Sequence, residues 1–252
     1  MLSQQPPPHC KSVHTFTYPL LTDSRTYSQS KRSFDCSNPV QGLNQADCNY
    51  MSSIGIHSQG INSHSNNGNI WVGSDGPNTF SFKANAGVDI TLIFWANPTG
   101  DYQSSFMNVR QPQVSYSIAN GQQVTISMEN NLSGGWAGLY DGKTTLSSFG
   151  QIFNTWGEIT TGPYGTVDVS REVNMGGNGM SIKVASGCVS DMDKCSFHCN
   201  SGTSCGESGT YSLMNCAAGS QSGASYGVYS GNPSGGCQGF ANGGHMDISF
   251  TN

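Results

Sequence analysis

Short apolar stretches alternate with polar and glycine-rich turns from residue 69 to the end of the chain. Phe80 and Phe82 alternate with polar neighbours, which predicts a strand with one buried face. Residues 88–95 are mostly β-branched or aromatic, so we expect a central strand there. Further strands are predicted at residues 70–72, 114–118, 124–128, 136–140, 211–214, 226–229 and 246–250, with three more between 154 and 184. No helical period longer than two turns appears before residue 188, so the pattern predicts an all-β chain folded as a β-sandwich.

One pair of these strands carries a turn signal. The segments 114–118 and 124–128 flank Asn120-Gly121, a dipeptide typical of two-residue hairpin turns. We therefore predict that the two segments pair with each other as a hairpin.

Composition narrows the classes of partner. The chain has 252 residues, of which 35% are hydrophobic and 10% charged, with a formal net charge of −5. Negative charge argues against nucleic acids and anionic membranes as partners. No apolar run reaches the roughly 18 to 20 residues that span a bilayer. We expect a soluble monomer without nucleic-acid or membrane partners.

The cysteines indicate the compartment. Six of the nine lie between residues 188 and 237, a density typical of secreted domains stapled by disulfides. The alternative, a zinc site, lacks any CxxC pair and has only His198 within the cluster. We expect disulfides of undetermined connectivity, and no metal or cofactor. The candidates are Cys36, Cys48, Cys188, Cys195, Cys199, Cys205, Cys216 and Cys237.

The chain divides into four segments by composition: 1–32, 33–68, 69–187 and 188–252. Residues 1–32 are basic and end at the dibasic pair Lys31-Arg32, and their removal would also remove Cys10 and leave eight cysteines. We expect this segment to be disordered or processed. Residues 33–68 are polar and turn-rich, and His57 and His64 there are expected to be solvated. Residues 69–187 form the predicted sandwich core, and residues 188–252 a cysteine-rich region with the closing strands.

Ionisable residues concentrate between Asn154 and Val184. If this segment is a strand, Asp168, Ser170 and Glu172 share one face and Arg171 points to the other. One interpretation is a structural network in which these acids pair with Arg171 or Lys183. The other is a site.

Glycoside hydrolysis needs two carboxyl groups, about 5 to 5.5 Å apart for retention or about 6.5 to 9.5 Å for inversion. Glu158 and Asp168, on neighbouring strands, are the candidate catalytic pair, with Glu158 as general acid. Trp136 and Trp156, in glycine-rich surroundings, are candidates to stack on a sugar ring, although a place in the core is the alternative. Asn131 begins a glycosylation sequon. Asp191 and Asp193 suggest either a calcium site or the start of a helix.

Several motifs occur in the order found in thaumatin-like proteins. Residues 80–95 (FSFKANAGVDITLIFW) resemble the first strand of that family, residues 134–140 (GGWAGLY) its Gly-Trp turn, and residues 167–180 (VDVSREVNMGGNGM) its acidic segment. The resemblance covers about residues 69–252 and implies a thaumatin-like β-sandwich with a disulfide-rich C-terminal extension. The motifs NTWGE, VDVSREVNM and CVSDMDKC are more specifically similar to the Asp f 4-like family of secreted fungal allergens.

Thaumatin-like proteins have an acidic cleft implicated in binding and weak hydrolysis of β-1,3-glucans. The resemblance places cleft positions at Glu158 and Asp168. A further cleft aspartate falls on Val173, with Glu172 one residue away as a candidate carbohydrate contact, and the cleft arginine has no confident counterpart. The resemblance therefore implies a cleft with an incomplete catalytic set.

Two functions follow as hypotheses. The first is a secreted protein of the fungal cell wall or a host surface, allergen- or effector-like, that acts by binding rather than catalysis. The second is a weak β-1,3-glucan-binding or glucan-hydrolysing protein that uses Glu158 and Asp168. The expected partner is a cell-wall polysaccharide or a host protein, and the expected location is extracellular, although no signal peptide is visible in the chain.

Overall fold

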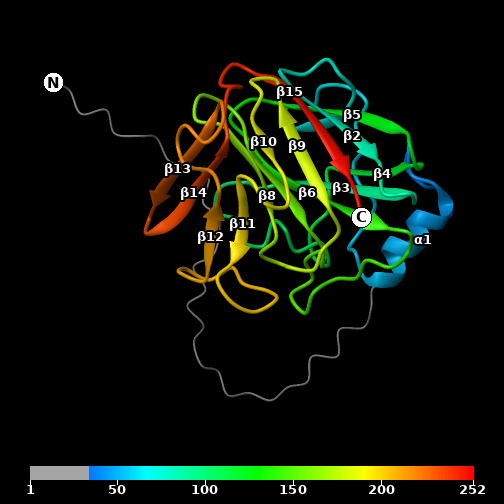
Figure 1. Ribbon diagram of the computed structural model, residues 1–252. Coiled ribbons are helices and arrows are strands. Elements are labelled where there is room, and N and C mark those ends of the chain that lie inside the picture. The colour runs from blue at the N-terminus through cyan, green and yellow to red at the C-terminus, as the bar shows by residue number, and fades with distance from the viewer. Residues whose placement is uncertain (1–33) are drawn as a thin grey trace.

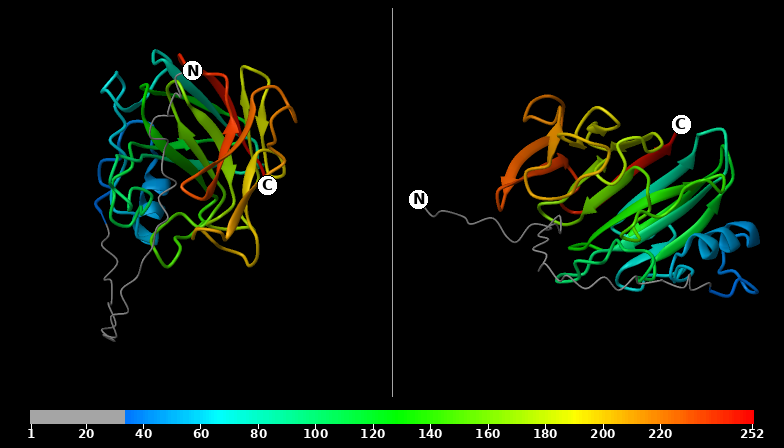
Figure 2. Two further views of the ribbon diagram at one scale, coloured as in Figure 1. Left: turned by 90° about the vertical axis from the view of Figure 1, so that its left-hand side faces the viewer. Right: turned by 90° about the horizontal axis from the view of Figure 1, so that it is seen from below.

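The computed structural model describes residues 34–252, which fold into two mixed β-sheets (Figures 1 and 2). The six-stranded sheet has the order β1-β5-β2-β15-β9-β10, and the larger sheet follows the order β12-β11-β8-β7-β6-β3-β4 with the β13–β14 hairpin attached at β8. The first sheet comprises β1 (Ile70–Val72), β2 (Asn78–Ala84), β5 (Gln123–Met128), β9 (Met180–Val184), β10 (Val189–Ser190) and β15 (Gly244–Phe250). The second comprises β3 (Ile90–Ala96), β4 (Val114–Ile118), β6 (Ser133–Tyr140), β7 (Trp156–Thr160), β8 (Thr166–Ser170), β11 (Ser196–Cys199), β12 (Tyr211–Met214), β13 (Ala224–Tyr229) and β14 (Asn232–Cys237). The prediction of an all-β chain is confirmed.

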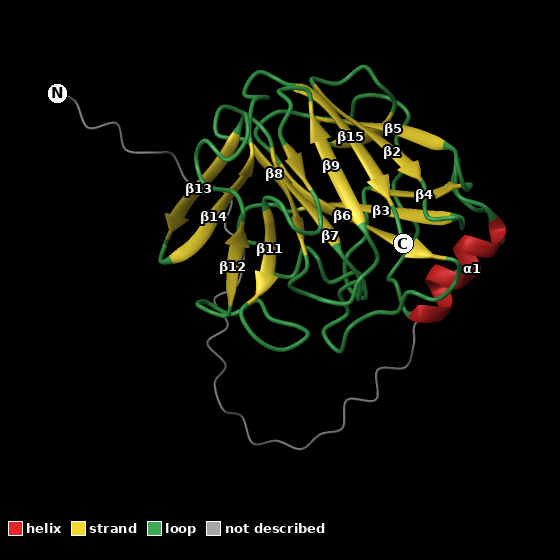
Figure 3. Cartoon of the chain, viewed as in Figure 1, coloured by secondary structure: helices red, strands yellow, loops and turns green. Residues whose placement is uncertain are grey.

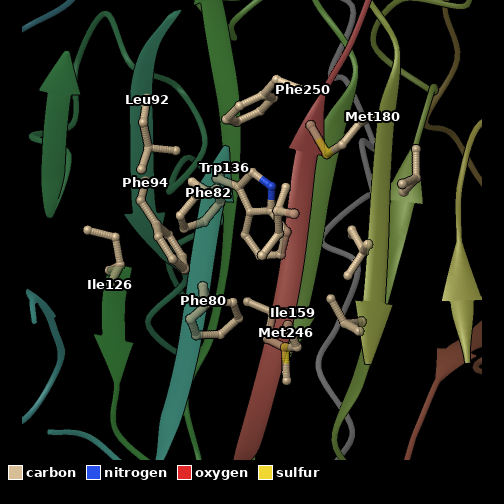
Figure 4. Close-up of a cluster of buried hydrophobic side chains, with 14 of the residues drawn as sticks. Phe80, Phe82, Leu92, Phe94, Ile126, Trp136, Ile159, Met180, Met246 and Phe250 are labelled. Atoms are coloured by element: carbon tan, nitrogen blue, oxygen red, sulfur yellow. The ribbon is translucent and has the colours of Figure 1, made fainter. Parts of the chain in front are cut away.

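Aromatic side chains fill the space between the two sheets (Figure 4). The ring of Trp136 from β6 lies 5.6 Å from Phe80, 5.3 Å from Phe82 and 5.3 Å from Phe94, in edge-to-face arrangements. Such pairs contribute about 0.5–1.5 kcal/mol each beyond the area they bury. This aromatic cluster fixes the position of β6, and through it the neighbouring strand β7.

A second hydrophobic cluster covers the outer face of the larger sheet. Strand β3 is buried at six of its seven positions because the main core lies on one face and this second cluster on the other. The apolar run predicted as a central strand therefore has a packing partner on each side.

Residues 33–68, predicted to be polar turns, contain the one helix of the described chain, α1 (Gln45–Ile54), which packs in this second cluster (Figure 3). Asn44 caps its start by accepting a hydrogen bond from the Asp47 amide, and Gly55 ends it in the left-handed conformation with φ 94°. The buried positions of the helix are Cys48, Met51 and Ser52. Because one of these three is polar, the apolar period is too weak to predict a helix from sequence.

The hairpin predicted for residues 114–118 and 124–128 is wrong. Strand β4 pairs with β3 in the larger sheet, and β5 pairs with β1 and β2 in the six-stranded sheet. The Asn120-Gly121 turn, with Gly121 at φ 80°, therefore passes the chain from one sheet to the other. Turn chemistry predicted the reversal of the chain but not which strand each segment joins.

All eight candidate cysteines form disulfides, which confirms the disulfide prediction. The pairs are Cys36–Cys48, Cys188–Cys237, Cys195–Cys216 and Cys199–Cys205. Cys10, the dibasic pair and the rest of residues 1–32 lie outside the described residues.

Residues 188–252 do not form a separate layer. They supply β10 and β15 to the six-stranded sheet and β11, β12 and β14 to the larger one. The β12–β14 region lies at the opposite side of the molecule from α1 (Figure 1). Within residues 34–252, no helix is long and apolar enough to cross a membrane.

Candidate acid site

Glu158 and Asp168 are direct cross-strand neighbours in the antiparallel pair β7–β8. Val167 and Val169, which flank Asp168, lie in the main core, so the alternation of a strand turns Asp168 and Ser170 to the outer face of the sheet. Side chains that face each other across such a pair have Cβ atoms about 4.5–5.5 Å apart. The strand register thus brings the two predicted catalytic carboxyl groups together on one face.

Glu172 lies two residues beyond the end of β8 and completes what we call the acid cluster: Glu158, Asp168 and Glu172. Asp168 is 6% exposed and Glu172 5%, whereas Glu158 is only half-buried. The cluster is therefore closed to solvent over two of its carboxyl groups and open at Glu158. Glu158, Asp168 and Glu172 thus form a mostly buried cluster, and a cleft beside them stays a prediction.

Among residues 34–252, no ion pair joins a member of the acid cluster to a lysine or arginine. Arg171 instead donates hydrogen bonds to the backbone carbonyls of Met175 and Met192. The interpretation as a network paired with Arg171 or Lys183 is thus contradicted within the described residues. Asp168 Oδ1 and Glu172 Oε2 are buried without a hydrogen-bond partner there.

The protonation of the cluster follows from this burial. Burial raises the pKa of Glu158 to about 7, and a hydrogen bond from the Ser170 side chain opposes the rise. Burial also raises the pKa of Asp168 well above its ordinary value, and the charges of Glu158 and Glu172 raise it further. The pKa of Glu172 is raised by burial and then by the charge of Glu158. At mildly acidic pH the cluster therefore retains protons that ordinary carboxyl groups have released.

Two glycines allow close backbone packing around the strands that carry this cluster. A Cβ at Gly157 would lie 2.1 Å from the ring of Trp136, and a Cβ at Gly236 on β14 would lie 2.7 Å from the Val167 carbonyl oxygen. Gly157 thus lets β7 pass over the core tryptophan, and Gly236 lets β14 lie against β8 beside Asp168.

The prediction that Trp136 and Trp156 stack on a sugar is corrected. Trp136 is 0% exposed in the main core, and Trp156 is 4% exposed in the second cluster. Trp156 packs edge-to-face on Trp95 at 4.9 Å and donates its indole N–H to the Ile152 carbonyl. Neither ring has a free face, because phenylalanines of the main core pack around Trp136 and the second cluster encloses Trp156.

The other candidate ligand residues are dispersed. Among the described residues, the one group of three possible metal ligands within 4.8 Å consists of Cys188, Cys195 and Cys237, whose sulfurs are all in disulfides. His57 and His64 are exposed. Three oxygens of the acid cluster do not come this close together, so its present geometry does not match a single metal ion.

Asp191 and Asp193 lie in a turn after β10, not in the predicted helix start. Asp191 Oδ1 accepts hydrogen bonds from the amides of Asp193 and Lys194. The Asp191 side chain thus satisfies backbone amides of its own turn, as Asp side chains commonly do. Asn131 lies exposed between β5 and β6, so the sequon is accessible, while its glycosylation stays a prediction.

The fold and the site define a class: an all-β, disulfide-stapled protein with an unpaired acid cluster on the outer face of one sheet. No family model matches the chain, and a search of curated proteins finds no matching relative. The resemblance to thaumatin-like and Asp f 4-like proteins therefore stays a prediction.

Proposed function

We propose that this protein acts outside the cell and binds a neutral polysaccharide at the acid cluster. Four disulfides support an oxidising compartment. The observation that carries the proposal is the combination of a partly buried Glu158, with a pKa of about 7, and two buried carboxyl groups that have no cationic partner in residues 34–252.

The ligand class follows from the protonated state of these groups. A protonated carboxyl group both donates and accepts hydrogen bonds, as sugar hydroxyls do, whereas a cluster of fixed charges would select a cation. Anionic polymers are disfavoured because they would meet the remaining negative charge. The choice of β-1,3-glucan, and of a fungal cell wall or host surface as the location, rests on the family resemblance alone. A host protein is the alternative partner on the same basis.

Retention on insoluble β-1,3-glucan tests the binding proposal. We expect the native protein to be retained at pH 5 and released as the pH rises through about 7, because Glu158 then loses its proton. Glu158→Gln keeps a neutral donor and acceptor, so its retention should persist above pH 7, whereas Glu158→Ala should bind weakly at every pH. Glu207→Gln, which removes an exposed carboxyl group elsewhere, is the control. Equal retention of native protein and Glu158→Ala would contradict the proposal.

Weak glycoside hydrolysis is a second candidate, favoured by the Glu158–Asp168 pairing across β7 and β8. A glutamic acid with a pKa near 7 is a competent general acid at acidic pH. We expect slow release of reducing ends from laminarin, abolished in Glu158→Gln although this variant still binds. Release of sugar at the native rate by Glu158→Gln would exclude Glu158 as the acid.

A further inference from the structure

A pocket of about 330 Å³ lies where two loops meet, apart from the acid cluster. One loop connects β6 to β7, and the other connects β8 to β9. Its lining residues lie at positions 140–141, 143–145, 153–154, 174 and 176–178, together with Val88 and Asn252. None of Glu158, Asp168 and Glu172 belongs to this lining.

Hydrogen bonds between the loops hold the pocket wall in place. Asn154 is 2% exposed, donates its amide to the Gly138 carbonyl at 2.9 Å and accepts from the Asn178 backbone amide at 2.7 Å. The Phe153 backbone amide donates to the Thr145 carbonyl at 2.9 Å, and the Asn174 side chain donates to the Phe153 carbonyl at 3.3 Å. The wall is therefore formed before any ligand arrives.

Several groups in this pocket remain available to a ligand. Phe153 is 36% exposed and contributes an aromatic ring to a wall that is otherwise mostly polar, with Val88 and Tyr140 as the other large apolar residues. The Asn178 side-chain amide and the Thr145 hydroxyl form no hydrogen bond with residues 34–252. Asp141 and Lys143 pair with each other at 2.9 Å with both side chains largely exposed, so the two charges cancel.

We propose that this pocket binds one sugar unit of a neutral saccharide. A sugar ring has a C–H face that packs on an aromatic ring, and hydroxyl groups that donate and accept hydrogen bonds at its rim. Phe153 supplies the ring, while Asn178, Thr145 and Asp141 supply both donors and acceptors. Balanced charge gives no preference for an anionic ligand, and the volume is at the small end of the range for ligand pockets.

The inference does not rest on the acid-cluster proposal, because the two sites share no residue. Chemical-shift titration of the full, ¹⁵N-labelled chain separates them. The probes are neutral trisaccharides of β-1,3-linked glucose, α-linked mannose and β-1,4-linked N-acetylglucosamine, with glucuronate and glucose 6-phosphate as charged counterparts. We expect at least one neutral probe to shift amides at 141–145, 153 and 174–178.

Two phenylalanines of one loop provide the matched comparison. Phe153→Ala should weaken the affinity about tenfold, corresponding to about 1.4 kcal/mol, and Asn178→Ala should weaken it as well. Phe149, which is 54% exposed and does not line the pocket, is the control, and Phe149→Ala should bind like the native protein. Glu158→Ala should also leave these shifts unchanged. Thermal unfolding of each variant verifies that the fold is intact.

Three results would overturn the inference. The first is no amide shift at these positions with any neutral probe up to about 10 mM, a concentration that detects even millimolar dissociation constants. The second is equal affinity in the native protein, Phe153→Ala and Asn178→Ala. The third is tighter binding of the charged probes than of the neutral ones.

Discussion

Glu158 owes its raised pKa to burial on the outer face of β7. A single glutamate at the edge of a sheet would be ionised at neutral pH, but burial beside Asp168 and Glu172 raises its pKa to about 7. Ser170 donates to it and offsets part of that effect. The charge of Glu158 in turn raises the pKa values of Asp168 and Glu172, so the protonation of one group affects the others.

The raised pKa values of the acid cluster make the free energy of unfolding depend on pH. A carboxyl group with a higher pKa in the folded chain than in the unfolded chain retains its proton over a range where the unfolded chain has released it. The folded state binds more protons there, so the free energy of unfolding should fall as the pH rises from about 4.5 to about 7. Glu158→Gln should flatten this slope and raise the stability at pH 7 by on the order of 1–3 kcal/mol.

Denaturant unfolding at a series of pH values measures the effect. The exposed-site control Glu207→Gln should reproduce the native slope, since it removes a carboxyl group outside the cluster. A native protein that gains stability between pH 4.5 and pH 7 would show that the cluster is not buried as described.

Patterns of single residues also determine which parts of the site could be predicted from the sequence. Strand alternation correctly placed Asp168 and Ser170 on one face, because a period of two needs only a strand assignment. The sequence left open whether Trp136 and Trp156 lie in the core or in a binding site, because their burial depends on which strands cover them. The Phe153 pocket joins loops about 20 residues apart or more, so no local pattern could indicate it.

At the scale of elements, β7 needs a glycine at position 157 to cross the core tryptophan. A Cβ there would lie 2.1 Å from Trp136, whose ring is enclosed by phenylalanines and cannot move aside. Gly157→Ala should therefore lower the free energy of unfolding by about 1–3 kcal/mol or more. Chemical denaturation measures this loss.

Gly227 in β13 is the matched control for this substitution. A Cβ at this strand position would have its nearest neighbour, the Ser234 carbonyl oxygen, at 3.9 Å. Gly227→Ala should thus leave stability nearly unchanged. Equal losses for the two variants would mean that general strand effects, not the contact with Trp136, determine the cost.

Whether a segment forms a strand was easier to predict from the sequence than which strand it pairs with. Most strands of residues 69–250 follow from alternating apolar positions, whereas β14 was missed because Pro233, Gly235 and Gly236 are residues that strands usually avoid. Strand β14 exists because it pairs with β13 and, at Cys237, with β8. The pairing of β4 and β5 with different sheets was likewise set by tertiary packing.

At the scale of the whole molecule, the disulfides differ in the length of chain that they close. Cys188–Cys237 joins residues 49 positions apart, and Cys199–Cys205 joins residues only 6 apart. In the chain-entropy account, closing the longer loop contributes about 4 kcal/mol and the shorter about 2 kcal/mol. The double variant Cys188→Ser/Cys237→Ser should therefore lose about twice the stability that Cys199→Ser/Cys205→Ser loses.

Unfolding in denaturant without reductant measures both variants. The Cys36–Cys48 pair, which joins residues 12 positions apart at α1, should give a loss between the two. A larger loss for the Cys199/Cys205 variant than for the Cys188/Cys237 variant would contradict the ordering by loop length.

Strand β15, the last strand of the chain, must be in place before the six-stranded sheet can be completed. It lies between β2 and β9, and its first residue, Gly244, pairs with Asn78. Before β15 is in place, the six-stranded sheet consists of two unconnected pieces, β1-β5-β2 and β9-β10. A ribosome must therefore release nearly all of residues 78–250 before this sheet can close, so the six-stranded sheet is completed only late in synthesis.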